Sequence, residues 1–246
     1  MEQERRSNVQ SVSRSNAVLG TLASRSPMTA REIGEAVGLD RTVVYRLLRT
    51  LESDDLVEVR GTDWRLGSGT LKIGMSYLDG LPFASVAPAY AIDLHRRAVA
   101  DRPWLVSLGV PAGDRVVLID RFWGQNSPLN SILPIGTRFE MGESATGIAL
   151  LAAMPPADAK AAMGTERIAA LQTKLDEACG NGGLAFAHDS LRAGLSAIAA
   201  PVLDRQGHVV GAINVSGIHM DDHLTVTSEL AQHVRRSAHS ITAALR

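Results

Sequence analysis

The chain has 246 residues, with 25 Lys or Arg against 26 Asp or Glu, and its formal net charge is -1. This length suits one small and one larger domain, and the balanced charge excludes a generally basic surface, so any nucleic-acid affinity must come from local patches. The single cysteine excludes an intramolecular disulfide and predicts a cytoplasmic protein, and the longest apolar run, 146–154, is too short to span a membrane.

An apolar face over residues 12–22 predicts the first helix, with Val18, Leu19 and Leu22 as its buried contacts. Residues 29–51 then have the spacing of a helix-turn-helix. Thr29 and Glu32 form a capping box, which satisfies two backbone donors at the start of a helix. The turn that follows is short, because glycine at 38 ends one helix in the left-handed conformation and aspartate at 40 caps the next.

The second helix of this pair has an apolar stripe from Val44 to Leu51 that we expect to pack inward. The opposite face carries Arg41, Thr42, Tyr45, Arg46 and Arg49. Arginine can donate two hydrogen bonds to guanine or bind a phosphate, and a recognition helix presents its N-terminal half to base edges. We predict that the first three residues contact bases and the last two contact phosphates. A merely solvated arginine-rich face is the alternative.

Two short alternating segments, 56–59 and 64–66, flank a tight turn at 60–63 and predict a β-hairpin. A hairpin directly after a helix-turn-helix is a wing, so residues 1–69 are predicted to form a winged helix-turn-helix DNA-binding domain. The polar arm that precedes the first helix contains Arg5 and Arg6. This arm is expected either to be disordered or to touch DNA.

Residues 70–88 are predicted to form a linker helix followed by a hinge, because Gly80 and Pro82 interrupt an apolar helical pattern. The first helix of the second domain is expected over 88–100, with Ala91, Leu94 and Ala98 facing inward. The connection between the two domains is therefore expected to bend between 80 and 88.

The second domain, 89–246, mixes strands and helices. Segments 104–110 and 115–122 around a turn at 111–114, and segments 196–203 and 209–215 around a turn at 204–207, predict two antiparallel hairpins. Helices are expected over 144–154, 167–179 and 224–245. The apolar stripe of the last helix is either core or an oligomer interface, and core is favoured. Together these elements describe an α+β sheet domain.

Four blocks of the sequence carry a resemblance to a known family. They are RTVVYRLL at 41–48, GESATGIALLA at 142–152, GLSAIAAPV at 194–202 and GAINVSG at 211–217. In this order and spacing, over residues 13–245, they resemble the IclR family of bacterial transcription regulators. The resemblance implies an α+β two-domain protein, with an N-terminal winged helix-turn-helix and a C-terminal GAF-like antiparallel-sheet effector-binding domain.

The resemblance adds one residue to the predicted DNA-binding set. Val43 occupies a position where the family usually has threonine. A valine cannot donate a hydrogen bond to phosphate, so Val43 either contacts a thymine methyl group or packs against the preceding helix.

The resemblance also implies an effector site over one face of the sheet. A small organic acid is expected at the N-terminus of the helix that begins near 144, because free N–H groups and the helix dipole favour an anion there. The matching positions are Leu133, Ser144, Ala145, Thr146, Ala187, Leu195, Ala197, Asn214 and Ser216.

This chain departs from the family at several of these positions. Ile148 stands where the family often has lysine, and Ala187 and Ser190 stand where it often has acidic residues. The site is therefore expected to have less charge and more apolar surface. We expect an effector larger than glyoxylate or pyruvate, such as an aromatic or alicyclic acid that Phe122 or Trp123 helps to enclose. The alternative is that these aromatic residues are ordinary core.

The sequence offers no catalytic constellation and implies no cofactor, so an enzyme is not expected. His219 and His223, with Asp221 and Asp222 between them, form a candidate metal cluster. They lie between a strand and a helix, however, where one of the aspartates more simply caps the helix.

The sequence thus predicts a ligand-responsive transcription regulator. It is expected to act as a homodimer or a dimer of dimers on an inverted-repeat operator in double-stranded DNA, and repressor and activator both stay open. The alternative is a ligand- or metal-binding protein whose winged helix mediates protein contacts. Only the first predicts steeply salt-dependent binding to a discrete duplex.

Overall fold

A computed structural model describes residues 9–127, 133–189, 191 and 193–246 of the chain. Arg5, Arg6 and Ser190, which the sequence analysis discussed, lie outside these residues. The chain divides into two compact units, Met1–Gly80 and Leu81–Arg246, each described by itself.

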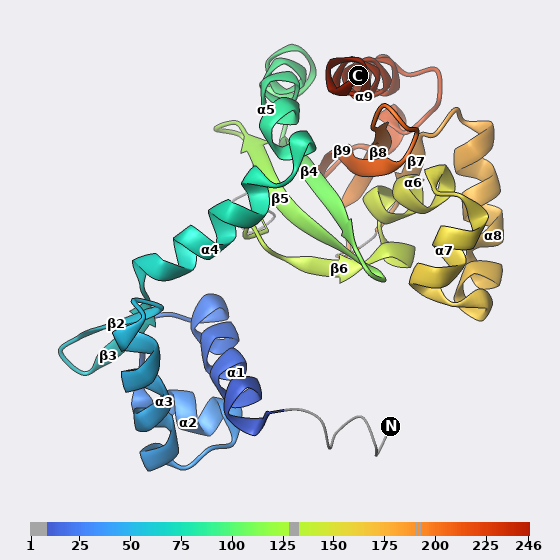
Figure 1. The fold of residues 1–246 in the computed structure, drawn as a ribbon. Helices are drawn as coiled ribbons and strands as arrows, with labels where there is room; N and C mark the ends of the chain where they lie inside the picture. Colours follow the sequence, from blue (N-terminus) through green and yellow to red (C-terminus); the bar gives the residue numbers. More distant parts are fainter. Residues whose placement is uncertain (1–8, 128–132, 190, 192) are drawn as a thin grey trace. The chain divides into compact units, whose positions relative to one another are not determined.

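The first unit combines helices with a small antiparallel sheet (Figure 1). Its helices are α1 (Gln10–Ser24), α2 (Ala30–Val37), α3 (Arg41–Ser53) and α4 (Ser68–Asp79). Its sheet has the order β1-β3-β2, from β1 (Met28–Thr29), β2 (Val57–Arg60) and β3 (Asp63–Leu66). The predicted helix-turn-helix and hairpin are confirmed. Strand β1 was not predicted, because two residues are too short to show an alternating pattern.

Local sequence signals produce the turn between α2 and α3. The Thr29 hydroxyl accepts from the Glu32 backbone N–H at 3.3 Å, and the Glu32 carboxylate accepts from the Thr29 N–H at 2.8 Å. Gly38 has a φ of 67°, which glycine adopts without steric cost. The Asp40 carboxylate then accepts from the Thr42 N–H at 2.7 Å. The capping box, the glycine end and the aspartate cap predicted from the sequence are therefore all confirmed.

The core of the first unit lies where α1, α2, α3 and the sheet meet. Val18, Ile33, Val44 and Leu48 are fully buried in one cluster, against which Trp64 of the wing packs. The expected inward face of α3 is confirmed at Val44, and each helix contributes apolar residues at helical spacing. The cluster thus fixes the orientation of α3 relative to the wing.

The second unit is an antiparallel sheet with helices on both faces (Figure 1). Its strands are β4 (Trp104–Ala112), β5 (Arg115–Trp123), β6 (Arg138–Glu140), β7 (Ala185–Ala187), β8 (Ser196–Leu203) and β9 (Val209–Gly217), in the order β6-β5-β4-β9-β8-β7. Its helices are α5 (Pro82–Leu94), α6 (Ala145–Ala153), α7 (Pro156–Met163), α8 (Thr165–Gly180) and α9 (Glu229–Leu245). The two predicted hairpins are β4–β5 and β8–β9.

Helices α5 and α9 cover one face of this sheet, and α6 covers part of the other with α8 packed on it. The two faces follow from the alternation of side chains along the strands. Ala199 and Ala212 join the apolar cluster beneath α6, whereas a Cβ on Gly211 would touch Phe83 of α5. In α9, the stripe that includes Leu230 and Val234 is buried, which confirms the favoured reading of that stripe as core.

The helix expected from Pro88 begins at Pro82 instead, and Pro88 lies inside it. Proline suits the first helical turn, where its missing N–H leaves no acceptor unpaired, so Pro82 starts a helix rather than a hinge. The predicted 70–88 linker is consequently divided between the two units. A π-helical turn at His95–Val99 then shifts the inward face by one residue, so that Val99 is buried instead of Ala98.

The remaining differences are at element ends and in short elements. The last helix begins at Glu229 and is capped by the Ser228 hydroxyl, so the expectation of a helix from Leu224 capped by an aspartate was wrong. Helix α7 was not predicted, nor were strands β6 and β7, whose three residues each are too few to show an alternating pattern. Among the residues that the structure describes, no helix is long and apolar enough to cross a membrane.

A close backbone approach holds the start of α6 against the preceding turn. A Cβ on Gly147 would lie 2.1 Å from the carbonyl oxygen of Met141. We expect Gly147→Ala to lower the free energy of unfolding by at least about 2 kcal/mol, because backbone rather than a flexible side chain must move. Urea unfolding measures this. Gly180→Ala is the control, since a Cβ there meets nothing within 4 Å, and equal effects of the two changes would contradict the prediction.

Candidate functional site

The outer face of α3 carries the residues predicted to contact DNA. Arg41, Thr42, Tyr45 and Arg46 are exposed, and Val43 is half-buried against the rest of the unit. Within the described part of the chain, neither Arg41 nor Arg46 forms an ion pair with a carboxylate. Their guanidinium groups are therefore available to an external anion or to a base edge.

Arg49 differs from Arg41 and Arg46, because its charge is engaged in contacts within the protein. Its guanidinium group lies 2.6 Å from the Glu52 carboxylate and donates to the Tyr45 hydroxyl at 2.7 Å. It also lies over the rings of Tyr45 and Trp64, at 5.1 and 5.7 Å from their centroids. The hydrogen bonds to Glu52 and Tyr45 raise the pKa of Arg49. Of the two predicted phosphate contacts, Arg46 is thus unpaired, and Arg49 links the recognition helix to the wing.

An open groove separates α3 from the wing. It is lined by Thr29, Ala30, Arg31, Arg41, Tyr45, Arg49, Val59, Gly61, Thr62 and Trp64. Arg31 and Thr62 were not predicted from the sequence, because their place in the groove depends on how α2 and the hairpin pack against α3. Arg31 is paired with Glu35 at 2.8 Å.

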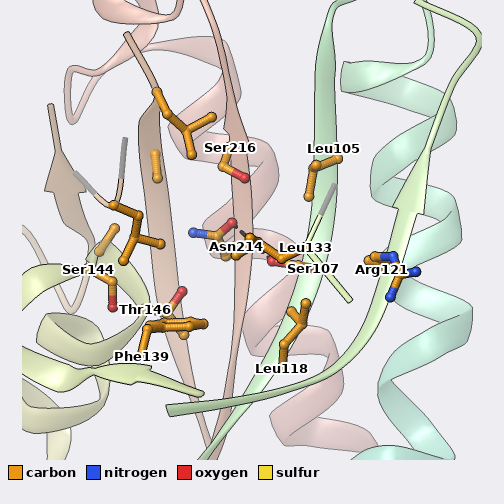
Figure 2. Close-up of a pocket in the computed structure, with 14 residues that line it drawn as sticks. Leu105, Ser107, Leu118, Arg121, Leu133, Phe139, Ser144, Thr146, Asn214 and Ser216 are labelled. Carbon is orange, nitrogen blue, oxygen red and sulfur yellow. Dashed lines mark hydrogen bonds between the residues drawn. The ribbon is translucent and has the colours of Figure 1, made fainter. Parts of the chain in front are cut away.

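A second candidate site is a pocket on the α6 face of the sheet (Figure 2). All the predicted effector positions line it except Ala187. The lining residues are Leu105, Ser107, Leu118, Arg121, Leu133, Phe139, Ser144, Ala145, Thr146, Leu191, Leu195, Ala197, Asn214 and Ser216. A mainly apolar lining with a few polar groups is typical of small-molecule sites.

The N-terminus of α6 forms one wall of this pocket. The Ser144 hydroxyl caps the helix by accepting from the Gly147 N–H at 3.0 Å. The first N–H groups of a helix have no intrahelical acceptor, so those of Ala145 and Thr146 remain at the pocket wall. This wall therefore favours a negatively charged group.

The floor of the pocket is polar at its centre. Ser107 on β4 and Asn214 on β9 are register partners, both buried, and the Ser107 hydroxyl donates to the Asn214 side-chain oxygen at 3.1 Å. The Asn214 amide nitrogen remains as a donor, and Figure 2 shows both side chains between Ser144 and Arg121. The floor can therefore hydrogen-bond a ligand oxygen.

Arg121 of β5 is the lining residue that sequence reasoning missed. It is the register partner of Ser107 and so lies on the pocket face of the sheet. Phe122, by contrast, pairs with Val106 on the opposite face, and Trp123 is exposed and does not line the pocket. The expectation for Phe122 was therefore wrong. Trp123 pairs with Leu105 of the pocket lining and lies beneath the Arg121 guanidinium group, so its role in enclosing the ligand stays a prediction. Phe139 of β6 supplies an aromatic wall.

Two of the positions at which a loss of charge was expected, Ile148 and Ala187, do not line this pocket, and Ser190 lies outside the described residues. Ile148 is buried in the core under α6. Ala187 lies on the edge strand β7 and faces a neighbouring cavity, which Ile148 and Lys174 also line. Ser144 stands between the two cavities, since it lines both. The pocket keeps a positive charge through Arg121.

Hydrogen bonds hold the segment that leads into β8 beside the pocket. The Asp189 carboxylate accepts from the Gly194 N–H at 2.6 Å. Asp221 accepts from His188 at 2.9 Å and from the Ser196 hydroxyl at 3.0 Å, and these bonds lower the pKa of the Asp221 carboxyl. The segment thereby fixes the position of Leu195 in the pocket wall.

The candidate metal cluster at 219–223 is not assembled as one set of ligands. Asp221 pairs with His188, as described above, whereas the His223 ring packs edge-on against Trp104 at 5.0 Å and lies 3.2 Å from the Arg102 guanidinium. These two side chains are thus engaged with different partners.

Comparison with known proteins matches both units. The family model "Bacterial transcriptional regulator IclR C-terminal" matches residues 75–243, and the IclR helix-turn-helix domain matches residues 11–61. The HTH-type transcriptional repressor AllR of Klebsiella pneumoniae is 29% identical over 258 residues, which covers 96% of this chain and 90% of that protein. The glycerol operon regulatory protein of Streptomyces coelicolor is 28% identical over 222 residues, or 85% of each chain.

A solved structure shows the same fold. It is a crystal structure of an IclR homolog from Microbacterium hydrocarbonoxydans complexed with 4-hydroxybenzoate, with a TM-score of 0.76 and 19% sequence identity. The match covers 96% of this chain and 99% of that one. The fold of this chain is therefore shared with an IclR homolog that has been crystallised with an aromatic acid.

The contacts of Arg49 predict a role in stability. We expect Arg49→Met to destabilise the first unit and lower its urea midpoint, because it removes stacking on two rings and an ion pair. Urea unfolding followed by Trp fluorescence measures the change. Arg46→Met removes the same charge from the same helix face without these contacts, and an equal loss in that variant would contradict the prediction.

Proposed function

The chain belongs to the IclR family of bacterial transcriptional regulators, and on that premise we propose that it binds an inverted-repeat operator in double-stranded DNA as a homodimer or a dimer of dimers. Paired recognition helices then enter successive major grooves, so the half-sites lie about one helical turn apart. The observation that carries this proposal is that two exposed arginines on α3, Arg41 and Arg46, form no ion pair with a carboxylate of the described residues. A net charge of -1 leaves DNA affinity to such local groups.

The residues of α3 divide into two roles. Arg41 and Thr42, at the N-terminal end of the helix, contact base edges together with Tyr45, and Val43 contacts a thymine methyl group. Arg46 contacts a phosphate. Arg49 acts indirectly, because it is bonded to Tyr45 and stacks on Trp64, and so positions the tyrosine and the wing.

The sheet domain is proposed to be a GAF-like effector-binding domain whose site is the pocket in Figure 2. A small organic acid places its carboxylate against the N–H groups of Ala145 and Thr146, and its apolar part contacts Leu133, Leu195 and Phe139. The apolar lining of the pocket and the aromatic acid in complex with the Microbacterium hydrocarbonoxydans homolog both support an aromatic or alicyclic effector.

Effector control needs a difference in affinity between two arrangements of the DNA-binding domains. Helix α4 ends at Asp79 and α5 begins at Pro82, so a short connection joins the two units along the chain. The ligand changes DNA affinity only by its own preference for one arrangement over the other.

The DNA-binding proposal predicts different effects for the two arginines. We expect Arg41→Ala to weaken operator binding by about 1 to 3 kcal/mol and to relax the preference at one base pair, whereas Arg46→Ala weakens binding to all duplexes alike. Mobility shifts on the DNA that flanks the gene for this chain, at several salt concentrations, measure both.

Arg96→Ala, which removes a charge from the sheet domain, is the control for these shifts. Equal, sequence-independent losses for Arg41→Ala and Arg46→Ala would refute base contact by Arg41. If folded protein binds neither the flanking DNA nor any duplex from a randomised pool, the alternative of a winged helix that mediates protein contacts is favoured.

The effector proposal predicts a preference for ring-containing acids. We expect 4-hydroxybenzoate to bind more tightly than pyruvate in calorimetry, because only the larger acid has an apolar ring that contacts the apolar walls of the pocket. Ala197→Leu adds a larger side chain to the pocket floor and should remove this binding while DNA binding remains. Tight binding of pyruvate without binding of any aromatic acid would contradict the prediction.

A further inference from the structure

Two nitrogens of the Arg121 guanidinium group are buried at the pocket, and no carboxylate of the described residues pairs with them. These Nε and Nη1 atoms have no hydrogen-bond partner among the described residues, although the group lies 5.4 Å from the centre of the Trp123 ring. Arg121 is the charged member of the pocket lining, which includes no Asp or Glu from the described part of the chain. A buried cation without an anion costs free energy, so this side of the pocket favours an anionic ligand group.

A β-bulge is what brings Arg121 to this face. Strand β5 pairs with β4 in one register from Ala112↔Arg115 to Gly109↔Leu118, and the register then shifts by one residue, so that Leu108 pairs with Asp120. Without the shift, Asp120 would stand opposite Ser107. The extra residue, Ile119, therefore replaces a carboxylate with a guanidinium group at the pocket. Bulges commonly re-aim a side chain next to a functional site.

Arg121 and the N-terminus of α6 lie on opposite sides of the pocket (Figure 2). Strand β4 separates β5, which carries Arg121, from β9, which carries Asn214. The floor between these two sides carries the Ser107–Asn214 pair, and the apolar side chains of Leu105, Leu118 and Phe139 line the pocket around it. The pocket thus has two groups that favour an anion, with apolar walls for the part of the ligand that joins them.

We propose that Arg121 binds one carboxylate of the effector while the N–H groups at the start of α6 bind a second, so that the effector is a dicarboxylic acid with an apolar spacer. Arginine suits this role because its planar group donates two parallel hydrogen bonds to a carboxylate. The inference rests on the proposed effector site and names the ligand class of that site.

The test is calorimetry with matched pairs of acids on the full chain. Each diacid is compared with the monoacid in which a methyl group replaces the second carboxylate: terephthalate with 4-methylbenzoate, adipate with hexanoate, and succinate with butyrate. We expect at least one diacid to bind at least about tenfold more tightly than its monoacid, because Arg121 gains a charge-assisted pair of hydrogen bonds. Arg121→Met should abolish that preference, and Arg121→Lys should keep part of it.

Arg138→Met is the matched control. Arg138 is exposed on β6, and its register partner is Val117, so it lies on the other face of the same sheet. Arg138→Met should keep the full preference for the diacid over its monoacid. Thermal unfolding without ligand provides a readout that does not depend on binding, and Arg121→Met should be at least as stable as the parent chain, because it removes an unpaired buried cation.

The inference is overturned if no diacid is preferred over its monoacid, or if Arg121→Met keeps the preference. It is also overturned if Arg121→Met unfolds at a markedly lower temperature, since Arg121 would then stabilise the fold. These results are distinguishable from failure of the effector site itself. If acids bind but each diacid binds no more tightly than its monoacid, the effector site is retained and the role of Arg121 is lost, whereas no binding of any acid removes both.

Discussion

The one-residue bulge at Ile119 decides which side chains of β5 meet the pocket. Before the bulge the alternation of the strand points Leu118 toward α6, and after it the same face receives Arg121 instead of Asp120. Without the bulge, the carboxylate of Asp120 would face the pocket. It would repel an acidic ligand that the helix N-terminus on the other wall attracts. The charge of the pocket, the place of Phe122 on the far face and the position of Trp123 all follow from this shift in register.

Features set by a few neighbouring residues could be predicted from the sequence. The capping box, the left-handed Gly38 and the hairpin turn at Gly61 depend on local backbone geometry, and they were predicted correctly. The pocket positions that the family resemblance implied also come together, apart from Ala187. Arg121 could not be found this way, because its direction depends on where the β4–β5 register slips, and no residue type marks that point. Similarly, the start of α5 could not be predicted, because Pro82 and Pro88 both suit the first turn of a helix and nothing local distinguishes them.

Packing between elements determines features of the fold that neither the sequence pattern nor the family resemblance predicts. Strand β1 pairs with β3, which is distant in the chain, and β1 and β7 each have too few residues to show a period. The same holds for the contact of Gly109 with Thr146, which lets α6 approach β4 at the edge of the pocket. Residues far apart in the sequence thus shape the site as much as the conspicuous motifs do.

The stack of Arg49 on Tyr45 and Trp64 divides the surface of α3 along its length. The C-terminal half of that surface is committed to holding the wing, while Arg41, Thr42 and Arg46 take no part in the core. Substitutions at the uncommitted positions can therefore accumulate with little loss of folding stability. Operator preference can therefore diverge during evolution, or be redesigned, through substitutions at these positions, while the stack of Arg49 on Tyr45 and Trp64 stays unchanged.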